Sequence, residues 1–191
     1  MNISSCCRLA ILGTFALASG ASTTPQELNK SIIWPSSGIT LSVKSAASPK
    51  VGDEAPEIEL PNPEGKVLKL SSLRGKVVLL DFWASWCGPC RHENPVTVAA
   101  YDKYKDKGFT VFSVSLDRSK ARWVQAIAQD KLTWENHVSD LQFWNSAAAA
   151  RYGVESIPAT FLIDASGKII GKDLRGRDLE KALTKAFPSG K

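Results

Sequence analysis

Two cysteines separated by two residues carry the clearest chemical signal in this sequence. They lie in the segment Trp86-Cys87-Gly88-Pro89-Cys90, directly after the nearly continuous apolar run 77–84. Residues three apart lie on one face of a helix, so the two sulfur atoms can form a disulfide without a change in the backbone. A helix that begins here would place partial positive charge beside the first sulfur, which favours the thiolate. The pair is therefore predicted to be a dithiol–disulfide redox centre.

The position of each cysteine predicts its role. Cys87 follows a loop and lies at the start of the helix, so its sulfur is expected to be the more exposed one and to act as the nucleophile. Cys90 lies one turn into the helix, so it is expected to be more buried and to act as the resolving thiol. Because burial raises the pKa of a thiol, Cys90 needs a proton acceptor nearby.

Two acidic residues are candidates for that proton acceptor. Asp81 interrupts the apolar run, and burial in a strand is expected to raise its pKa towards neutrality, which suits a proton shuttle. The alternative places Asp81 at the strand end, where it would accept backbone N–H groups. Glu93 follows Cys90 by three residues and projects near the same helix face, unless it is a solvated surface residue. Which acid serves Cys90 is left open.

A zinc site and a purely structural disulfide are the other interpretations of the cysteine pair. Zinc requires a third and a fourth ligand, usually from a second pair of closely spaced residues. The chain offers only Cys6, Cys7 and two widely separated histidines, His92 and His137. A structural disulfide closing so small a loop would constrain the unfolded chain little. Redox chemistry is therefore favoured over both.

Strand and helix patterns alternate from residue 51 onward and would position the pair. Turn signals at Asn62-Pro63-Glu64-Gly65 and Ala165-Ser166-Gly167 indicate two hairpins. Alternating strands and helices that end in a strand hairpin imply an α/β fold, namely a three-layer α/β/α sandwich. In the predicted helix 119–130, the side chains expected to face the core are Trp123, Val124 and Ile127. Strands are predicted over 57–60, 67–70, 77–83, 109–116, 160–163 and 168–172, and helices over 90–107, 119–130, 145–152 and 178–187.

The N-terminal residues have the features of a secretory signal peptide. Arg8 supplies a positive charge, residues 9–18 form a short apolar segment, and Ala16-Leu17-Ala18 offers a small-x-small cleavage motif. An uncleaved N-terminal membrane anchor is the alternative. The predicted organisation is a signal peptide over 1–21, an irregular leader over 22–50 and one domain over 51–191.

Composition and charge narrow the class of protein. Processing would remove Cys6 and Cys7 and leave one cysteine pair, in a periplasmic or other extracytoplasmic location. Hydrophobic residues make up 43% of the 191 residues, enough for an ordinary core. The net charge of +5 is spread along the sequence rather than clustered with aromatic residues. No nucleic-acid partner is therefore expected.

The segment Phe82-Trp83-Ala84-Ser85-Trp86-Cys87-Gly88-Pro89-Cys90 resembles the active-site segment of the thioredoxin superfamily. The wider pattern, over roughly residues 51–187, is similar to the extracytoplasmic TlpA/ResA-like branch of that superfamily. It is carried by Gly52-Asp53-Glu54-Ala55-Pro56, Leu73-Arg74-Gly75-Lys76, Arg91-His92-Glu93-Asn94-Pro95 and Tyr152-Gly153-Val154-Glu155-Ser156-Ile157-Pro158-Ala159-Thr160-Phe161-Leu162-Ile163-Asp164.

The resemblance implies a thioredoxin-like sandwich with a mixed central sheet, preceded here by the N-terminal β-hairpin. It implies an extracytoplasmic thiol–disulfide oxidoreductase that needs no organic cofactor. Gly88-Pro89 between the cysteines resembles reducing thioredoxins, so a reductase is expected. Asp81 matches the buried acid of thioredoxins, and Glu93 matches an active-site acid of the TlpA/ResA-like branch. The presence of both acids departs from each simpler pattern.

The resemblance also identifies the second half of the site. X–Pro bonds are usually trans, but the proline that matches Pro158 is cis in this superfamily and packs opposite the cysteines. The backbone of Ile157 is then expected to pair with an extended substrate segment. Trp86 is expected to contact partners, whereas Trp83 is expected to belong to the core.

By resemblance, the expected substrates are disulfides of envelope proteins, including the oxidised haem-binding cysteines of apocytochromes c. A membrane thiol carrier of the DsbD type would supply electrons, and a monomer is expected. A copper chaperone that uses Cys87, Cys90 and a histidine is one alternative, although the closest such relatives space their cysteines one residue wider. A peroxiredoxin-like peroxidase is another, but residues 85–90 do not supply its Thr-x-x-Cys site.

Overall fold

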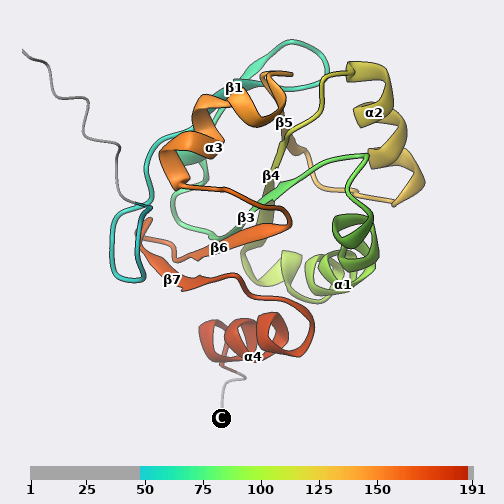
Figure 1. Ribbon diagram of the computed structural model, residues 1–191. Helices are drawn as coiled ribbons and strands as arrows, with labels where there is room; N and C mark the ends of the chain where they lie inside the picture. Colours follow the sequence, from blue (N-terminus) through green and yellow to red (C-terminus); the bar gives the residue numbers. More distant parts are fainter. Residues whose placement is uncertain (1–47, 189–191) are drawn as a thin grey trace, which may run out of the picture. The chain divides into compact units, whose positions relative to one another are not determined.

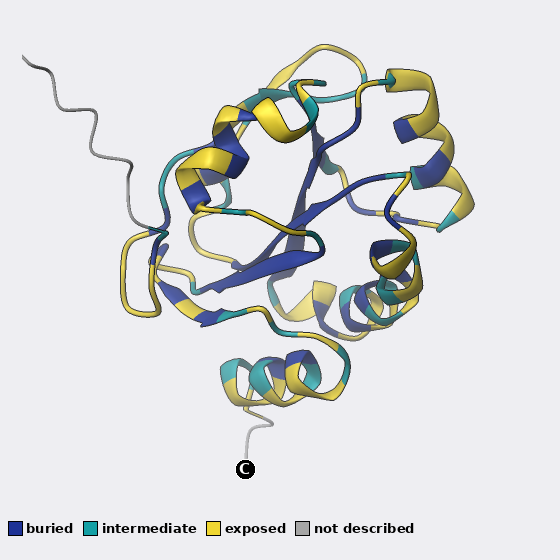
Figure 2. Ribbon diagram, viewed as in Figure 1, coloured by how far each residue is buried: buried dark blue, intermediate teal, exposed yellow. Residues whose placement is uncertain are grey.

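The apolar run before the cysteines forms β3, Val77–Trp83, at the centre of a five-stranded sheet with the order β5-β4-β3-β6-β7. All seven residues of β3 are buried (Figure 2). β3 runs parallel to β4, with Asp81 opposite Ser113, and antiparallel to β6, with Asp81 opposite Thr160. The sheet is therefore mixed, and the carboxyl end of its central strand leads directly to the cysteine pair.

The computed structural model describes residues 48–188 (Figure 1). The predicted signal peptide lies outside the described residues, as does the predicted leader apart from its last three residues. The strands are β1 Glu59–Pro61, β2 Val67–Lys69, β3 Val77–Trp83, β4 Phe109–Ser115, β5 Asn136–Val138, β6 Ala159–Ile163 and β7 Ile169–Lys172. The helices are α1 Gly88–Tyr104, α2 Lys120–Gln129, α3 Ala147–Tyr152 and α4 Gly176–Ala186, and the 3₁₀ turns are η1 Leu70–Leu73, η2 Lys105–Lys107 and η3 Phe143–Asn145.

Helices cover both sides of the sheet, as the alternating pattern predicted. α1 and α4 pack together on one side, whereas α3 lies on the other side (Figure 1). The predicted N-terminal hairpin is present as the antiparallel pair β1–β2. The predicted α/β/α sandwich with a mixed central sheet is therefore confirmed. No helix within residues 48–188 has the length and apolar character needed to cross a bilayer.

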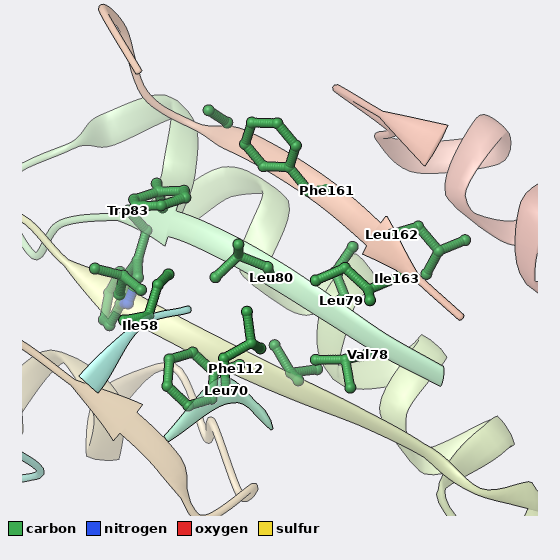
Figure 3. Close-up of a cluster of buried hydrophobic side chains, with 14 of the residues drawn as sticks. Ile58, Leu70, Val78, Leu79, Leu80, Trp83, Phe112, Phe161, Leu162 and Ile163 are labelled. Carbon is green, nitrogen blue, oxygen red and sulfur yellow. The ribbon is translucent and has the colours of Figure 1, made fainter. Parts of the chain in front are cut away.

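The core lies on both faces of β3 and its neighbours. Figure 3 shows side chains from the first hairpin region, the central strands and β6 in contact. Burial of this kind contributes about 25 cal/mol for each Å² of apolar surface removed from water. The residues labelled there are Ile58, Leu70, Val78, Leu79, Leu80, Trp83, Phe112, Phe161, Leu162 and Ile163.

Two sequence expectations about the fold are wrong in detail. Val124 was expected to face inward, but it is exposed, because one residue of helix turns it about 100° away from the buried Trp123. The second difference is β5, which lies between the predicted helices 119–130 and 145–152, where no strand was predicted, and pairs with the edge of β4. β5 has three residues, too few to show the alternation by which a strand is detected.

Candidate active site

The cysteine pair occupies the junction between β3 and α1. Cys87 is the N-cap of α1, and its sulfur accepts a hydrogen bond from the Cys90 N–H at 3.2 Å. A disulfide joins the two residues, whose Cα atoms are 5.3 Å apart. Pro89 occupies the first helical turn, as predicted. The helix N-terminus therefore directs both an N–H group and partial positive charge at the Cys87 sulfur.

The two cysteines differ in what surrounds them more than in how far they are exposed. Cys87 is 5% exposed and Cys90 is 1% exposed. Cys87 is the more exposed of the two, in agreement with its expected role, but it is still a buried residue. Its sulfur lies 3.8 Å from the carbonyl oxygen of Ile157, and the Ile157–Pro158 peptide bond is cis. The structure therefore places Ile157 and Pro158 against the cysteine pair, as expected.

Both candidate acids lie on the inner side of the disulfide. Asp81, Glu93 and Cys90 line one small enclosed cavity, together with Pro158. Its volume is about 10 Å³, close to the minimum that holds one water molecule. A single water could therefore connect a carboxyl group to the Cys90 sulfur.

Asp81 has the electrostatic character expected of a proton acceptor. Its side chain is 7% exposed, and burial raises its pKa to about 7, with a further upward contribution from the negative charge of Glu93. The positive charge of Arg175 acts in the opposite direction. Within residues 48–188 the Asp81 carboxyl accepts no hydrogen bond, so the alternative role at a strand end is not observed.

Glu93 has a defined partner, unlike a solvated surface glutamate. Its carboxylate oxygen accepts a hydrogen bond from the N–H of Gly176 at 2.6 Å. Gly176 is the first residue of α4, where N–H groups have no partner within the helix. Glu93 therefore caps α4 from a different helix and is held beside the cavity that contains Asp81.

Arg175 is a site residue that the sequence did not reveal. Its guanidinium group donates a hydrogen bond to the carbonyl oxygen of Pro158. The β7–α4 connection thus supplies two donors to the site, namely the Arg175 side chain and the Gly176 N–H. The only sequence signal is a basic residue directly before a helix, and nothing in its spacing relates it to the cysteines.

The loop before Cys87 is fixed by a buried carboxylate. Asp117 accepts hydrogen bonds from the N–H and the hydroxyl of Ser85, at 2.9 and 2.5 Å. Arg91, on α1, donates to the carbonyl oxygen of Ser85 at 3.1 Å and forms an ion pair with Asp130. These contacts hold the loop in one position relative to β4 and α1. Sequence reasoning missed Asp117 and Asp130, which lie far from the cysteines along the chain.

The two tryptophans near the cysteines have different environments. Trp83 is completely buried at the end of β3, which confirms its expected place in the core. Trp86 is 45% exposed, and its indole N–H donates to the carbonyl oxygen of Leu116 at 3.3 Å. The hydrogen bond therefore fixes the indole ring of Trp86 while part of its surface stays exposed.

Neither histidine considered as a metal ligand forms a metal-binding group with the cysteine pair in the described residues. His137 is buried on β5, where burial lowers its pKa to about 4. His92 is exposed on α1. In the described part of the chain, no group of three or more His, Cys, Asp and Glu side chains is placed to hold a metal ion. Cys6 and Cys7 lie outside the described residues.

Known proteins that resemble this chain share its fold and its cysteine chemistry. Residues 51–172 match the AhpC/TSA family. Thiol-disulfide oxidoreductase ResA from Bacillus anthracis is 34% identical over 143 residues, which cover 73% of this chain and 80% of the relative. The ResA of Bacillus thuringiensis subsp. konkukian is 32% identical over the same shares.

Solved structures give the same assignment. The thioredoxin domain of a thiol-disulfide oxidoreductase from Bacteroides vulgatus has a TM-score of 0.68 and 38% identity, covering 72% of this chain and 98% of that chain. A thiol:disulfide interchange protein from Bacteroides sp. has a TM-score of 0.66 and 37% identity, covering 77% of this chain and 94% of that chain. Together with the disulfide-forming cysteine pair at the junction of β3 and α1, these matches show that the chain belongs to the AhpC/TSA family and to its ResA-like thiol–disulfide oxidoreductases.

Proposed function

We propose that this enzyme reduces protein disulfides outside the cytoplasm, with Cys87 as the nucleophile and Cys90 as the resolving thiol. The observation that carries the proposal is the asymmetry of the pair. The Cys87 sulfur caps a helix and lies against the Ile157 carbonyl oxygen, where a substrate chain would enter. The side chain of Cys90 instead lines the enclosed cavity that contains both acids.

The reaction transfers two electrons from the reduced cysteine pair to the substrate. The Cys87 thiolate attacks one sulfur of the substrate disulfide, an S–S bond forms between the two proteins, and the other substrate sulfur leaves as a thiolate. Cys90 then gives up its proton and attacks the Cys87 sulfur. The second substrate sulfur is released, and the enzyme is left with the Cys87–Cys90 disulfide that the structure contains.

Asp81 is the residue that we assign to accept the proton of Cys90. A pKa of about 7 keeps it close to the balance between its two forms at neutral pH, where a general base works best. Burial raises the pKa of Asp81, and the negative charge of Glu93, which is itself held by α4, raises it further. Ile157 and Pro158 would hold the substrate backbone, and Trp86 would contact side chains that flank the substrate cysteine.

Proteins of the cell envelope are the proposed substrates, among them apocytochromes c with oxidised haem-binding cysteines. A membrane thiol carrier of the DsbD type would return electrons to Cys87 and Cys90, and the enzyme would act as a monomer. The signal-like features of residues 1–21 and the resemblance to the TlpA/ResA-like branch support this location.

Trapping of the mixed disulfide tests the proposed roles. Cys90→Ser should accumulate a covalent complex with its protein substrates, because the second step is lost, whereas Cys87→Ser should form none. Mass spectrometry of the complexes captured in cells would identify the partners. Full reduction of insulin disulfides by Cys87→Ser would show that the assigned roles are wrong.

A further inference from the structure

Three aromatic side chains form an exposed surface next to the nucleophilic cysteine. Trp86 lies 5.0 Å from Phe143 and 6.1 Å from Trp144, measured between ring centroids, and Phe143 and Trp144 are 5.9 Å apart. Trp86 is 45% exposed and Trp144 is 40% exposed. We call these three residues the aromatic platform. Its members come from the cysteine loop and from η3, more than fifty residues later in the chain.

The aromatic platform is held in one arrangement before any partner binds. The Trp86 indole N–H is hydrogen-bonded to the Leu116 carbonyl oxygen. The guanidinium group of Arg118 lies 4.3 Å from the centre of the Phe143 ring, close enough for a cation–π contact. Phe143 also has a φ of 57°, a conformation that costs a bulky residue roughly 1–3 kcal/mol. The surrounding contacts must therefore offset this strain.

The fold gives no reason for two tryptophans to be exposed at this place. The other large hydrophobic residues exposed within residues 48–188 are aliphatic, and they lie on other elements: Val51, Val67, Val124 and Ile170. Tryptophan is enriched where protein surfaces bind partners, because it offers a large, rigid contact area. The exposed aromatic surface is thus concentrated beside the reactive sulfur.

We propose that the aromatic platform binds the residues that flank the substrate cysteine and so selects extended segments with a large apolar side chain close to the disulfide. This inference rests on the proposed function, since the substrate must first be a polypeptide disulfide. A substrate sulfur joined to Cys87 places its neighbours over Trp86, the adjacent residue. An extended chain advances about 3.3 Å per residue, so residues two to four positions from the substrate cysteine reach Trp144.

The position of the aromatic platform beside Cys87 indicates that the molecule covering it is the substrate polypeptide. Trp86 precedes Cys87 directly, and Trp144 extends the same surface by one ring. Any protein held in the mixed disulfide must cover part of this surface. Glycine or small polar side chains would leave the two indole rings in water, whereas a leucine or an aromatic side chain would remove apolar area from water on both partners.

Two peptides of matched disulfide reactivity would test the proposal. Each contains one disulfide, and they differ only in having leucine or glycine at the second and third positions beyond one cysteine. Reduction by dithiothreitol provides the intrinsic rate of each disulfide. We expect the reduced enzyme to favour the leucine peptide about tenfold in kcat/KM, which corresponds to one contact of about 1.4 kcal/mol. Trp144→Ala should remove most of that preference, and the control Ile170→Ala should retain it.

The outcomes separate this inference from the proposed function. The selection by the aromatic platform would be overturned if the native enzyme reduced both peptides at equal rates, or if Trp144→Ala kept the preference for leucine. Either result would leave the proposed disulfide reduction unaffected. If dithiothreitol reduces both peptides and the enzyme reduces neither, both proposals fail.

A second measurement covers the case in which Trp144→Ala does not fold. The Trp144 indole resonance, assigned with Trp144→Phe, should move clearly further when Cys90→Ser is linked to the leucine peptide than when it is linked to the glycine peptide. The same shift with both peptides, or none with either, would contradict the inference.

Discussion

The two sides of one disulfide differ more than the two cysteines themselves. On the Cys87 side, the sulfur faces the Ile157 carbonyl oxygen, and the exposed aromatic platform begins at the preceding residue, Trp86. On the Cys90 side, the side chain borders an enclosed cavity with Asp81 and Glu93. The same chemical group therefore receives two roles from its surroundings. The outer side is built for contact with another chain, and the inner side is built to handle a proton.

Asp81→Asn should have the largest effect on the inner side. Without a base in the cavity, the attack of Cys90 on the mixed disulfide should slow by about 100-fold, the lower end of the usual range for general base catalysis. Stopped-flow tryptophan fluorescence with a preformed mixed disulfide would isolate this step. The first attack by Cys87 should change much less. Equal slowing of both steps would mean that Asp81 does not act on Cys90.

The same substitution should stabilise the fold at neutral pH. Burial raises the pKa of Asp81 to about 7, above its value of about 3.9 in an unfolded chain. The folded state therefore holds the proton more tightly, so stability declines as pH rises from about 4 to 7 and levels off above that. Asp81→Asn should gain about 4 kcal/mol at pH 8 and nothing at pH 3.5. Urea unfolding at the two pH values would measure the change in the free energy of unfolding. An equal gain in stability at both pH values would show that the ionisation of Asp81 is not its cause.

Glu93→Gln should shift the pH dependence of the inner step to lower pH. Removing the negative charge lowers the pKa of Asp81, so the base is deprotonated at lower pH. The midpoint of the rate–pH curve should fall by roughly half a pH unit, as expected for one partly hydrated charge. A midpoint that stays in place would show that Glu93 does not influence Asp81.

Arg175→Met should produce the smallest effect, in the opposite direction. Arg175 lowers the pKa of Asp81, so its loss should move the midpoint to higher pH. The shift should be smaller than that of Glu93→Gln, because Arg175 is exposed and water screens its charge. Arg177→Met, two residues along and also exposed, is the matched control and should leave the midpoint unchanged. Equal midpoint shifts in both variants would show that the overall surface charge, and not Arg175 in particular, affects the pKa of Asp81.

Local patterns in the sequence predicted the outer framework of the site. The strand 77–83 was evident from its apolar run, and the helix start was evident from the spacing of Cys87 and Cys90 with Pro89 between them. Burial of Asp81 followed from its place in that run. Each of these features depends on residues that are neighbours along the chain.

Contacts between segments that are distant along the chain could not be predicted from the sequence. The hydrogen bond of Arg175 to Pro158, and the meeting of Trp86 with Phe143, depend on how loops from different elements converge. The buried anchor Asp117 holds the cysteine loop from the end of β4. No periodicity or spacing records such convergence, because the loops that make these contacts are irregular and only the assembled sheet brings them together.

Selective alkylation of the reduced enzyme would test the asymmetry most directly. One equivalent of iodoacetamide at pH 7, followed by peptide mass spectrometry, reports which sulfur is the accessible thiolate. The structure predicts that Cys87 takes nearly all of the label and that Cys90 stays unmodified. Predominant labelling of Cys90, or equal labelling of both cysteines, would contradict the division of roles between the two sides of the disulfide.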